Sequence, residues 1–137
     1  MARNIIDLPT LGDDGKLYRD TAVDMVESLI PNLWKSCHAP DLLELENGDL
    51  LCCWFAGSRE GNADISIAVA RLPADAEQWE QPVIVSDDPT RSEQNPSLFQ
   101  NPNGDIWLMY TAQATKKPDD NSDDSLQGTA EIRRKIS

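Results

Sequence analysis

The strongest constraint on the fold is an internal repeat. Pro96 lies 56 residues after Pro40, and the same spacing separates two leucines and two Asn-Gly-Asp segments. The identical pairs are Pro40/Pro96, Leu42/Leu98, Asn47/Asn103, Gly48/Gly104 and Asp49/Asp105. Because one short unit cannot bury its apolar face alone, repeated units of this kind stack on one another.

Each copy of the repeat predicts a β-hairpin. A short apolar run leads to an Asn-Gly pair and then to a second apolar run, and both turn residues tolerate the positive φ of tight hairpin turns. Residues 50–55 are apolar at both odd and even positions, so both faces of a strand there would be apolar. This pattern predicts a central strand whose two faces are covered by other layers.

Two further strands follow in the first copy. Residues 64–70 place large apolar side chains on one face and small ones on the other, and we expect the small-residue face to suit close sheet-on-sheet stacking. Residues 82–86 begin with proline, which costs no ladder hydrogen bond at the start of a strand. Four antiparallel strands followed by a repeat are typical of a propeller blade. The large apolar residues are Ile65, Ile67 and Val69.

The sequence therefore predicts an all-β chain that holds about the first two antiparallel, four-stranded blades of a β-propeller. We expect an N-terminal arm over residues 1–35, a first blade over 36–90 and an incomplete second blade over 91–137. Residues 130–137 repeat the Ala-acid-Ile opening of residues 63–70. No counterpart of the fourth strand follows them, which favours truncation of a longer parent.

Two segments are less regular. Residues 22–30 fit a short amphipathic helix or an edge strand equally well, and an edge strand there could close a propeller ring. Residues 116–128 are polar and acidic. A calcium loop that started at Asp119 would need glycine where Asp124 stands and an acid where Ala130 stands, so we expect a solvated loop.

The charge excludes some classes of partner. The chain carries 24 acidic and 12 basic residues, a net charge of −12, and such a field repels nucleic acid and anionic membrane surfaces. The first ten residues lack the pattern of a secretory signal, and the longest apolar run is too short to span a bilayer. We expect a cytoplasmic chain.

The cysteines and glycines point to no cofactor. Cys37, Cys52 and Cys53 cannot all pair within the chain, and the adjacent two face opposite sides of a strand. We expect reduced, buried thiols. One histidine and no CxxC spacing argue against a metal site, and no glycine-rich phosphate loop is present. Trp54, Trp107 and Tyr110 lie within predicted strands and are expected to be core residues.

Several motifs occur in one order: His38-Ala39-Pro40, Gly57-Ser58-Arg59-Glu60-Gly61, Asp64-Ile65 and Gln94-Asn95-Pro96, with the two Asn-Gly-Asp turns among them. Together they resemble the BNR repeat-like branch of the sialidase superfamily over about residues 36–112. The resemblance implies a six-bladed β-propeller. Of the Asp-box turn that names these repeats, Asp75 and Trp79 remain.

The resemblance also implies a site: arginines that clamp a substrate carboxylate, a tyrosine nucleophile primed by a glutamate, and an aspartate acid/base. His38 stands where the first arginine is expected, and imidazole offers one donor where guanidinium offers two parallel ones. Arg59 corresponds to a loop arginine, and either Glu60 or Asp64 lies near the acid/base position. Asn95 would bind sugar hydroxyls. Alternatively, Asp64 caps a turn and Arg59 and Glu60 form a surface ion pair.

These features favour a fragment of a sialidase-like glycoside hydrolase that acts on a terminal sugar. We expect it to be inactive alone, because the remaining catalytic groups of the family would lie outside it. The alternatives are a non-catalytic glycan-binding module and a truncated gene product. The expected ligand is a carbohydrate, and exposed blade edges predict self-association or a complementary chain.

Overall fold

The computed structural model describes residues 6–7, 12–117, 119–120 and 126–137. These residues form three β-sheets and no α-helix. The first sheet has the order β4 (Ser36–Glu44), β5 (Leu50–Gly57), β6 (Ser66–Leu72) and β7 (Val83–Ile84), all antiparallel. The all-β class and a four-stranded antiparallel unit are thus confirmed, and β5 is a central strand as predicted.

The second sheet repeats the first as far as its third strand. It has the order β8 (Arg91–Gln100), β9 (Ile106–Ala114) and β10 (Glu131–Ile136), again antiparallel, with a short 3₁₀ turn, η1 (Gln127–Thr129), before β10. The Ala-acid-Ile segment near the C-terminus is therefore a third strand, as its likeness to residues 63–70 predicts. Part of the predicted acidic loop 116–128 lies outside the described residues.

The repeat extends to backbone geometry. In both hairpin turns the glycine has positive φ, +85° at Gly48 and +95° at Gly104, and an asparagine side chain bonds the aspartate that follows it. Each first strand also has an irregularity in its register at the same place in the repeat. There Ala39 and Asn95 adopt φ of +53° and +51°. Equivalent positions thus adopt the same uncommon conformation with different side chains.

One core lies between the two sheets. Its buried side chains come from β5, from β6 with the residue before it, and from β9. They are Cys53, Phe55, Ile65, Ile67, Leu108 and Tyr110, with Val69 and Leu98 packed at the margin. The large apolar face of β6 therefore makes the sheet-on-sheet contact. The expectation that the small-residue face would do so is wrong, because that face is covered by another layer.

The second core lies on the opposite face of the first sheet. Ala68, Ala70 and Leu72 of β6 and Cys52 and Trp54 of β5 pack against bulky side chains from outside the sheet. Small side chains on the strand leave room for indole rings. The covering residues are Leu17, Trp34 and Trp79.

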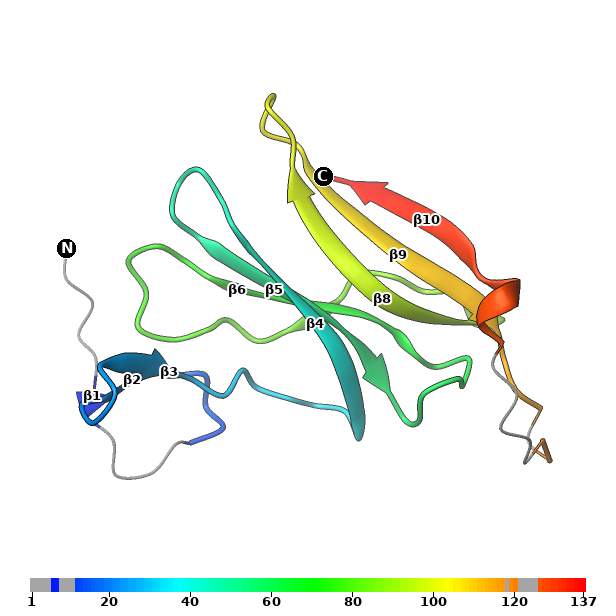
Figure 1. Cartoon of the computed structure of the whole chain (residues 1–137), viewed down its shortest axis with the longest axis horizontal. Coiled ribbons are helices and arrows are strands. Elements are labelled where there is room, and N and C mark those ends of the chain that lie inside the picture. Colours follow the sequence, from blue (N-terminus) through cyan, green and yellow to red (C-terminus); the bar gives the residue numbers. More distant parts are fainter. Residues whose placement is uncertain (1–5, 8–11, 118, 121–125) are drawn as a thin grey trace.

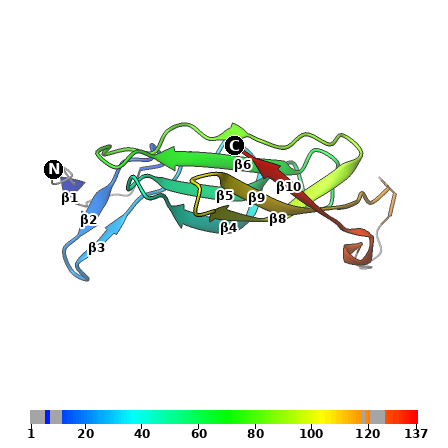
Figure 2. The ribbon, with the colours of Figure 1, turned by 90° about the horizontal axis from the view of Figure 1, so that it is seen from above.

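The N-terminal arm carries a third, small sheet. β1 (Ile6–Asp7) runs parallel to β2 (Tyr18–Asp20), which pairs with β3 (Met25–Glu27) in a hairpin, so residues 25–27 are an edge strand and the helix alternative is wrong. Trp79 fixes the arm: its backbone N–H donates to the carbonyl of Gly15 (2.9 Å) and its indole N–H to the Ser28 hydroxyl (2.9 Å). The hairpin projects from the end of the molecule far from β10 (Figures 1 and 2).

The cysteines differ in exposure. Cys52 and Cys53 are buried in the two different cores, as the alternation of side chains predicts. Cys37 is exposed, so the expectation of three buried thiols is wrong at this position. It lies on β4, the edge strand of its sheet, at the border of an open cleft beside the N-terminal arm, which covers it only in part.

Polar contacts fix the two sheets relative to each other. The Asp41 carboxylate on β4 accepts hydrogen bonds from the Ser97 hydroxyl (3.0 Å) and the Leu98 backbone N–H (2.7 Å) on β8. The Glu93 N–H donates to the carbonyl of Ile65 (2.9 Å). With the sheets held in this way, the two hairpin turns lie toward one end of the molecule, and the β5–β6 loop and η1 toward the other (Figure 1).

Candidate functional site

The β5–β6 loop has a defined conformation. At its start, a Cβ on Gly57 would lie 2.6 Å from the carbonyl oxygen of Asp64, so only glycine fits there without a shift of backbone. Within the loop, the Asn62 N–H donates to the Arg59 carbonyl (3.1 Å) and the Ile65 N–H to the Asn62 carbonyl (3.2 Å). The loop is thus a pair of tight turns that presents its polar side chains outward.

A polar cleft of about 550 Å³ lies between this loop and the segment after β9. A backbone hydrogen bond from Lys116 N–H to the Gly61 carbonyl (3.4 Å) joins the two walls. The lining carries three cationic and two acidic side chains, with small polar groups between them. The lining residues are Arg59, Glu60, Asn62, Ala63, Thr115, Lys116, Lys117 and Asp120.

This set of groups is suited to a polar ligand with negative charge. Guanidinium and ammonium groups bind carboxylates through charge-assisted hydrogen bonds, and carboxylates accept hydrogen bonds from hydroxyl groups. Arg59 and Glu60 line the same cleft. Among the ion pairs of the described residues, none joins Arg59 to Glu60.

Asp64 makes a different set of contacts. Its two carboxylate oxygens accept hydrogen bonds from the Ser58 backbone N–H (3.1 Å) and the Ser58 hydroxyl (2.9 Å), across the mouth of the loop. The Ser58 hydroxyl also accepts a bond from the Asn62 side-chain amide (3.1 Å). These are the contacts of a residue that caps a turn, which is one of the two roles that the sequence leaves open for Asp64.

His38 lines another cleft. On β4, its ring stands edge-on to that of Phe55, with centroids 5.7 Å apart. It borders a mostly apolar cleft of about 280 Å³ between the N-terminal arm and the first sheet, with Cys37, Trp54 and Leu29 among its neighbours. His38 and Arg59 therefore line separate clefts.

Asn95 lies at the irregularity of β8. Its side-chain amide donates to the Thr111 hydroxyl on the neighbouring strand β9 (3.3 Å). The hydroxyl of Thr111 in turn donates to the Gln94 carbonyl (3.1 Å). The three aromatic residues predicted as core differ in burial: Trp54 and Tyr110 are buried, whereas Trp107 is half-buried.

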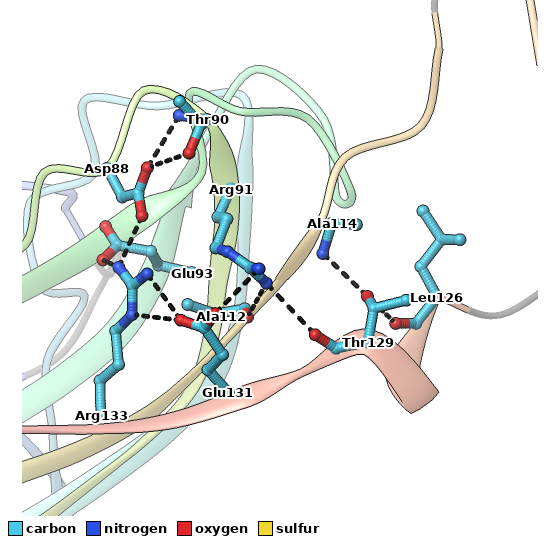
Figure 3. A network of polar contacts seen from close by, with 10 residues as sticks. All are labelled: Asp88, Thr90, Arg91, Glu93, Ala112, Ala114, Leu126, Thr129, Glu131 and Arg133. Atoms are coloured by element: carbon cyan, nitrogen blue, oxygen red, sulfur yellow. Dashed lines mark hydrogen bonds and ion pairs between the residues drawn. The ribbon is translucent and has the colours of Figure 1, made fainter.

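A buried polar network was not predicted from the sequence (Figure 3). Glu93 is 1% exposed, and its carboxylate accepts a hydrogen bond from the Ser86 hydroxyl (2.6 Å). Ser86 also accepts the backbone N–H of Ile67 (2.7 Å). Arg133 on β10 lies 3.9 Å from Glu93 and 2.6 Å from Asp88, so one guanidinium faces two carboxylates from other elements. A run of polar residues in a strand, residues 91–95, was the available signal.

The electrostatics of this network follow from these contacts. The pKa of Asp88 is lowered to about 2, chiefly because the Thr90 hydroxyl and N–H donate to its carboxylate, with a further contribution from Arg133. The pKa of Arg133 is raised by Glu131 and Asp88. Both residues are therefore charged at neutral pH, and the network joins the end of the first sheet to β10.

Arg91 holds the segment before β10 in place. Its guanidinium donates to the carbonyls of Ala112 (3.0 Å) and Thr129 (3.2 Å) and pairs with Glu131 (2.9 Å). The Thr129 hydroxyl accepts the Ala114 N–H (2.9 Å) (Figure 3). The end of β9, which leads into the cleft, is thereby tied to the start of β10.

In the described part of the chain, no three or more His, Cys, Asp or Glu side chains gather as metal ligands would. None of the described helices is long and apolar enough to cross a membrane.

Comparisons with known proteins bear on the family. The chain resembles a protein of unknown function from Dyadobacter fermentans DSM 18053, with a TM-score of 0.56 and 16% sequence identity over 74% of this chain, which supports the fold alone. The match spans 32% of that protein. No curated protein matches. The model of the BNR repeat-like domain matches residues 48–129, more than half of the chain and including the β5–β6 loop. The chain therefore belongs to the BNR repeat-like domain family, within the sialidase superfamily.

Proposed function

We propose that the two larger sheets are the first two blades of a sialidase-like propeller and that the polar cleft binds the acidic end of a terminal sugar. The observation that carries this proposal is the concentration of cationic side chains at the cleft. Arg59, Lys116 and Lys117 line it, although the chain as a whole has a net charge of −12. Against the two acidic side chains of the lining, Glu60 and Asp120, this leaves a surplus of one positive charge, and a positive surplus in an otherwise acidic protein favours an anionic ligand.

The residues of the cleft have distinct roles in this proposal. Arg59 forms a bidentate contact with the sugar carboxylate, and Lys117 adds a second positive charge. Glu60, on the same loop, is placed to protonate the leaving oxygen of a glycosidic bond in an intact ring. Cleavage also needs a second group on the other side of the bond, a base or a nucleophile. The 137 residues alone therefore bind the sugar without cleaving it.

A non-catalytic glycan-binding module is the second candidate. The observation that favours it is the environment of Asp64, whose two carboxylate oxygens both accept hydrogen bonds from Ser58. Both oxygens are therefore used to hold the turn, which gives Asp64 a structural role in the loop. One of the two acids that the sequence offers for catalysis is thus engaged in the turn, as expected of a loop that binds a glycan without cleaving it.

The experiment compares ligands that differ only in the carboxylate. The chain is titrated, by calorimetry and by NMR, with the methyl glycosides of glucuronic acid and N-acetylneuraminic acid and with the methyl ester of each. We expect one of the free acids to bind and its ester to bind at least about tenfold more weakly, as loss of a charge-assisted contact implies. Equal binding of acid and ester, or binding of neither acid, would contradict the proposal.

Matched variants then locate the site. Arg59→Met should abolish the preference for the acid, whereas Arg19→Met, on the N-terminal arm, should leave it unchanged. Hydrolysis of the corresponding umbelliferyl glycosides by the 137-residue chain would contradict its inactivity. In a longer protein that completes the ring, loss of turnover with retained binding in Glu60→Gln favours the hydrolase. Unchanged turnover in both Glu60→Gln and Asp64→Asn excludes both residues as the acid. Retained binding with no turnover in the complete ring favours the binding module.

A further inference from the structure

In the described part of the chain, the outer edge of the second sheet is strand β10. In the first sheet β6 pairs with β5 and β7, whereas its counterpart β10 pairs with β9 alone among the described residues. Two apolar side chains of β10 are exposed, Ile132 by 78% and Ile136 by 49%. Between them Arg134 lies over the Trp107 ring, 4.5 Å from its centroid. A strand edge of this kind is a template for pairing with another strand.

The N-terminal arm has a second such edge. In the order β1-β2-β3, strand β3 is at the margin, and all three of its residues are exposed. Met25 is 56% exposed and Leu29, just beyond the strand, 45%. Glu27 lies between them. β3 lies at one end of the molecule and β10 in the opposite half, so one chain cannot join the two edges to each other (Figures 1 and 2).

The two edges are complementary in charge and in pattern. β10 carries three basic residues and one acidic residue, Glu131, whereas β3 carries one acid, Glu27, and no base. Arg133 already pairs with Asp88 and Glu131. The basic side chains of β10 that remain for Glu27 are Arg134 and Lys135. In an antiparallel pair, directly opposite residues share one face, and side chains alternate between faces. If Glu27 stands opposite Arg134, apolar residues stand opposite each other on both sides of this ion pair. The resulting pairs on one face are Met25 with Ile136, Glu27 with Arg134 and Leu29 with Ile132.

We propose that this chain associates with a second copy of itself, with β3 of one copy adding antiparallel to the β10 edge of the next. Backbone hydrogen bonds supply affinity and the alternating side chains set the register. The contact is head-to-tail, because it uses two different surfaces, so it generates rings or open chains of copies. The inference does not depend on the function of the polar cleft.

Sedimentation velocity of the 137-residue chain over a range of concentrations tests the association. We expect species larger than a monomer that increase with concentration. Glu27→Arg and Arg134→Glu should each weaken the association about tenfold or more, because like charges then oppose each other. The double variant that carries both changes should associate again. Glu46→Arg and Lys35→Glu make the same charge changes at exposed positions outside the contact and should have no effect.

Cysteine cross-linking tests the register. In a Cys37→Ser background, Glu27→Cys with Arg134→Cys should give a ladder of disulfide-linked copies under mild oxidation. Glu27→Cys with Lys135→Cys should give almost none, because a shift by one residue places the side chain on the other face. Circular dichroism confirms that each variant is folded. A monomer at all concentrations, failure of the charge exchange to restore association, or equal cross-linking of the two cysteine pairs would overturn the proposal.

Discussion

Ile67 offers the most direct test of how the two sheets hold together. Its side chain is fully buried in the core between the sheets, beside Phe55 and Tyr110. Ile67→Ala removes three carbon groups, worth about 2.4 kcal/mol of transfer free energy at ~0.8 kcal/mol each. Because β6 is held by strands on both sides, the cavity cannot close fully, and we expect a total loss of ~3–4 kcal/mol. That is a large share of the ~5–15 kcal/mol typical of a domain.

Urea unfolding followed by tryptophan fluorescence measures this loss. With a slope of roughly 2 kcal/mol per molar urea, the midpoint should fall by roughly 1.5–2 M. Ile67→Val should cost ~1 kcal/mol. Ile132→Ala, in which the side chain is 78% exposed, is the matched control and should cost less than about 0.5 kcal/mol when measured on the monomer. Equal losses in the two Ile→Ala variants would refute the view that this core joins the sheets.

Three further results are expected. Burial raises the pKa of Cys52 to about 11 and that of Cys53 to about 12. Ellman's reagent at pH 8 should therefore titrate Cys37 alone in the folded chain and all three thiols after unfolding. Rapid reaction of all three thiols in the folded chain would contradict this. Because the folded-state pKa of Asp88 is lowered from 3.8 to about 2, its contribution to stability is complete above pH 3.8 and is lost as the pH falls toward 2. The difference in melting temperature between the parent chain and Asp88→Asn should therefore shrink over that range. A constant difference would argue against this role of Asp88. Gly57→Ala should destabilise the chain by ~1–3 kcal/mol, because its Cβ would meet the Asp64 carbonyl oxygen at 2.6 Å, whereas Gly128→Ala, with no atom within 4 Å of its Cβ, should unfold at nearly the parent urea concentration.

The repeat and the alternation of side chains predicted the strands well. They identified both hairpins, the central position of β5 and the third strand near the C-terminus, because these features depend on local pattern. They did not identify which layer covers each face. The small face of β6 accommodates Trp79 and the arm, and Cys37 lies on an edge strand, and neither fact follows from periodicity.

The candidate site was predicted only in part, for a similar reason. The sequence singled out Arg59 and Glu60 in one loop. The opposite wall of the cleft comes from a segment that shares no motif with that loop, and its lining residues are Thr115, Lys116, Lys117 and Asp120. Glu93 and Arg133 were missed because they are far apart in the sequence and lie within strands whose pairing brings them together. Contacts across sheets depend on register, which a single sequence specifies weakly.

The hydrogen bonds of Asp41 have a consequence for how successive units align. Ser97 occupies in the second unit the place that Asp41 occupies in the first. The Asp41 carboxylate therefore accepts a hydrogen bond from the residue at the equivalent position of the next unit. Two apolar sheet faces can slide past each other at little cost, since dispersion and burial have no direction. Two donors that converge on a single carboxylate allow one alignment. Ser97 has a hydroxyl instead of a carboxylate, so the second unit cannot offer the same charged acceptor to another sheet. In this chain the carboxylate therefore aligns the second sheet on the first and has no equivalent on the second sheet.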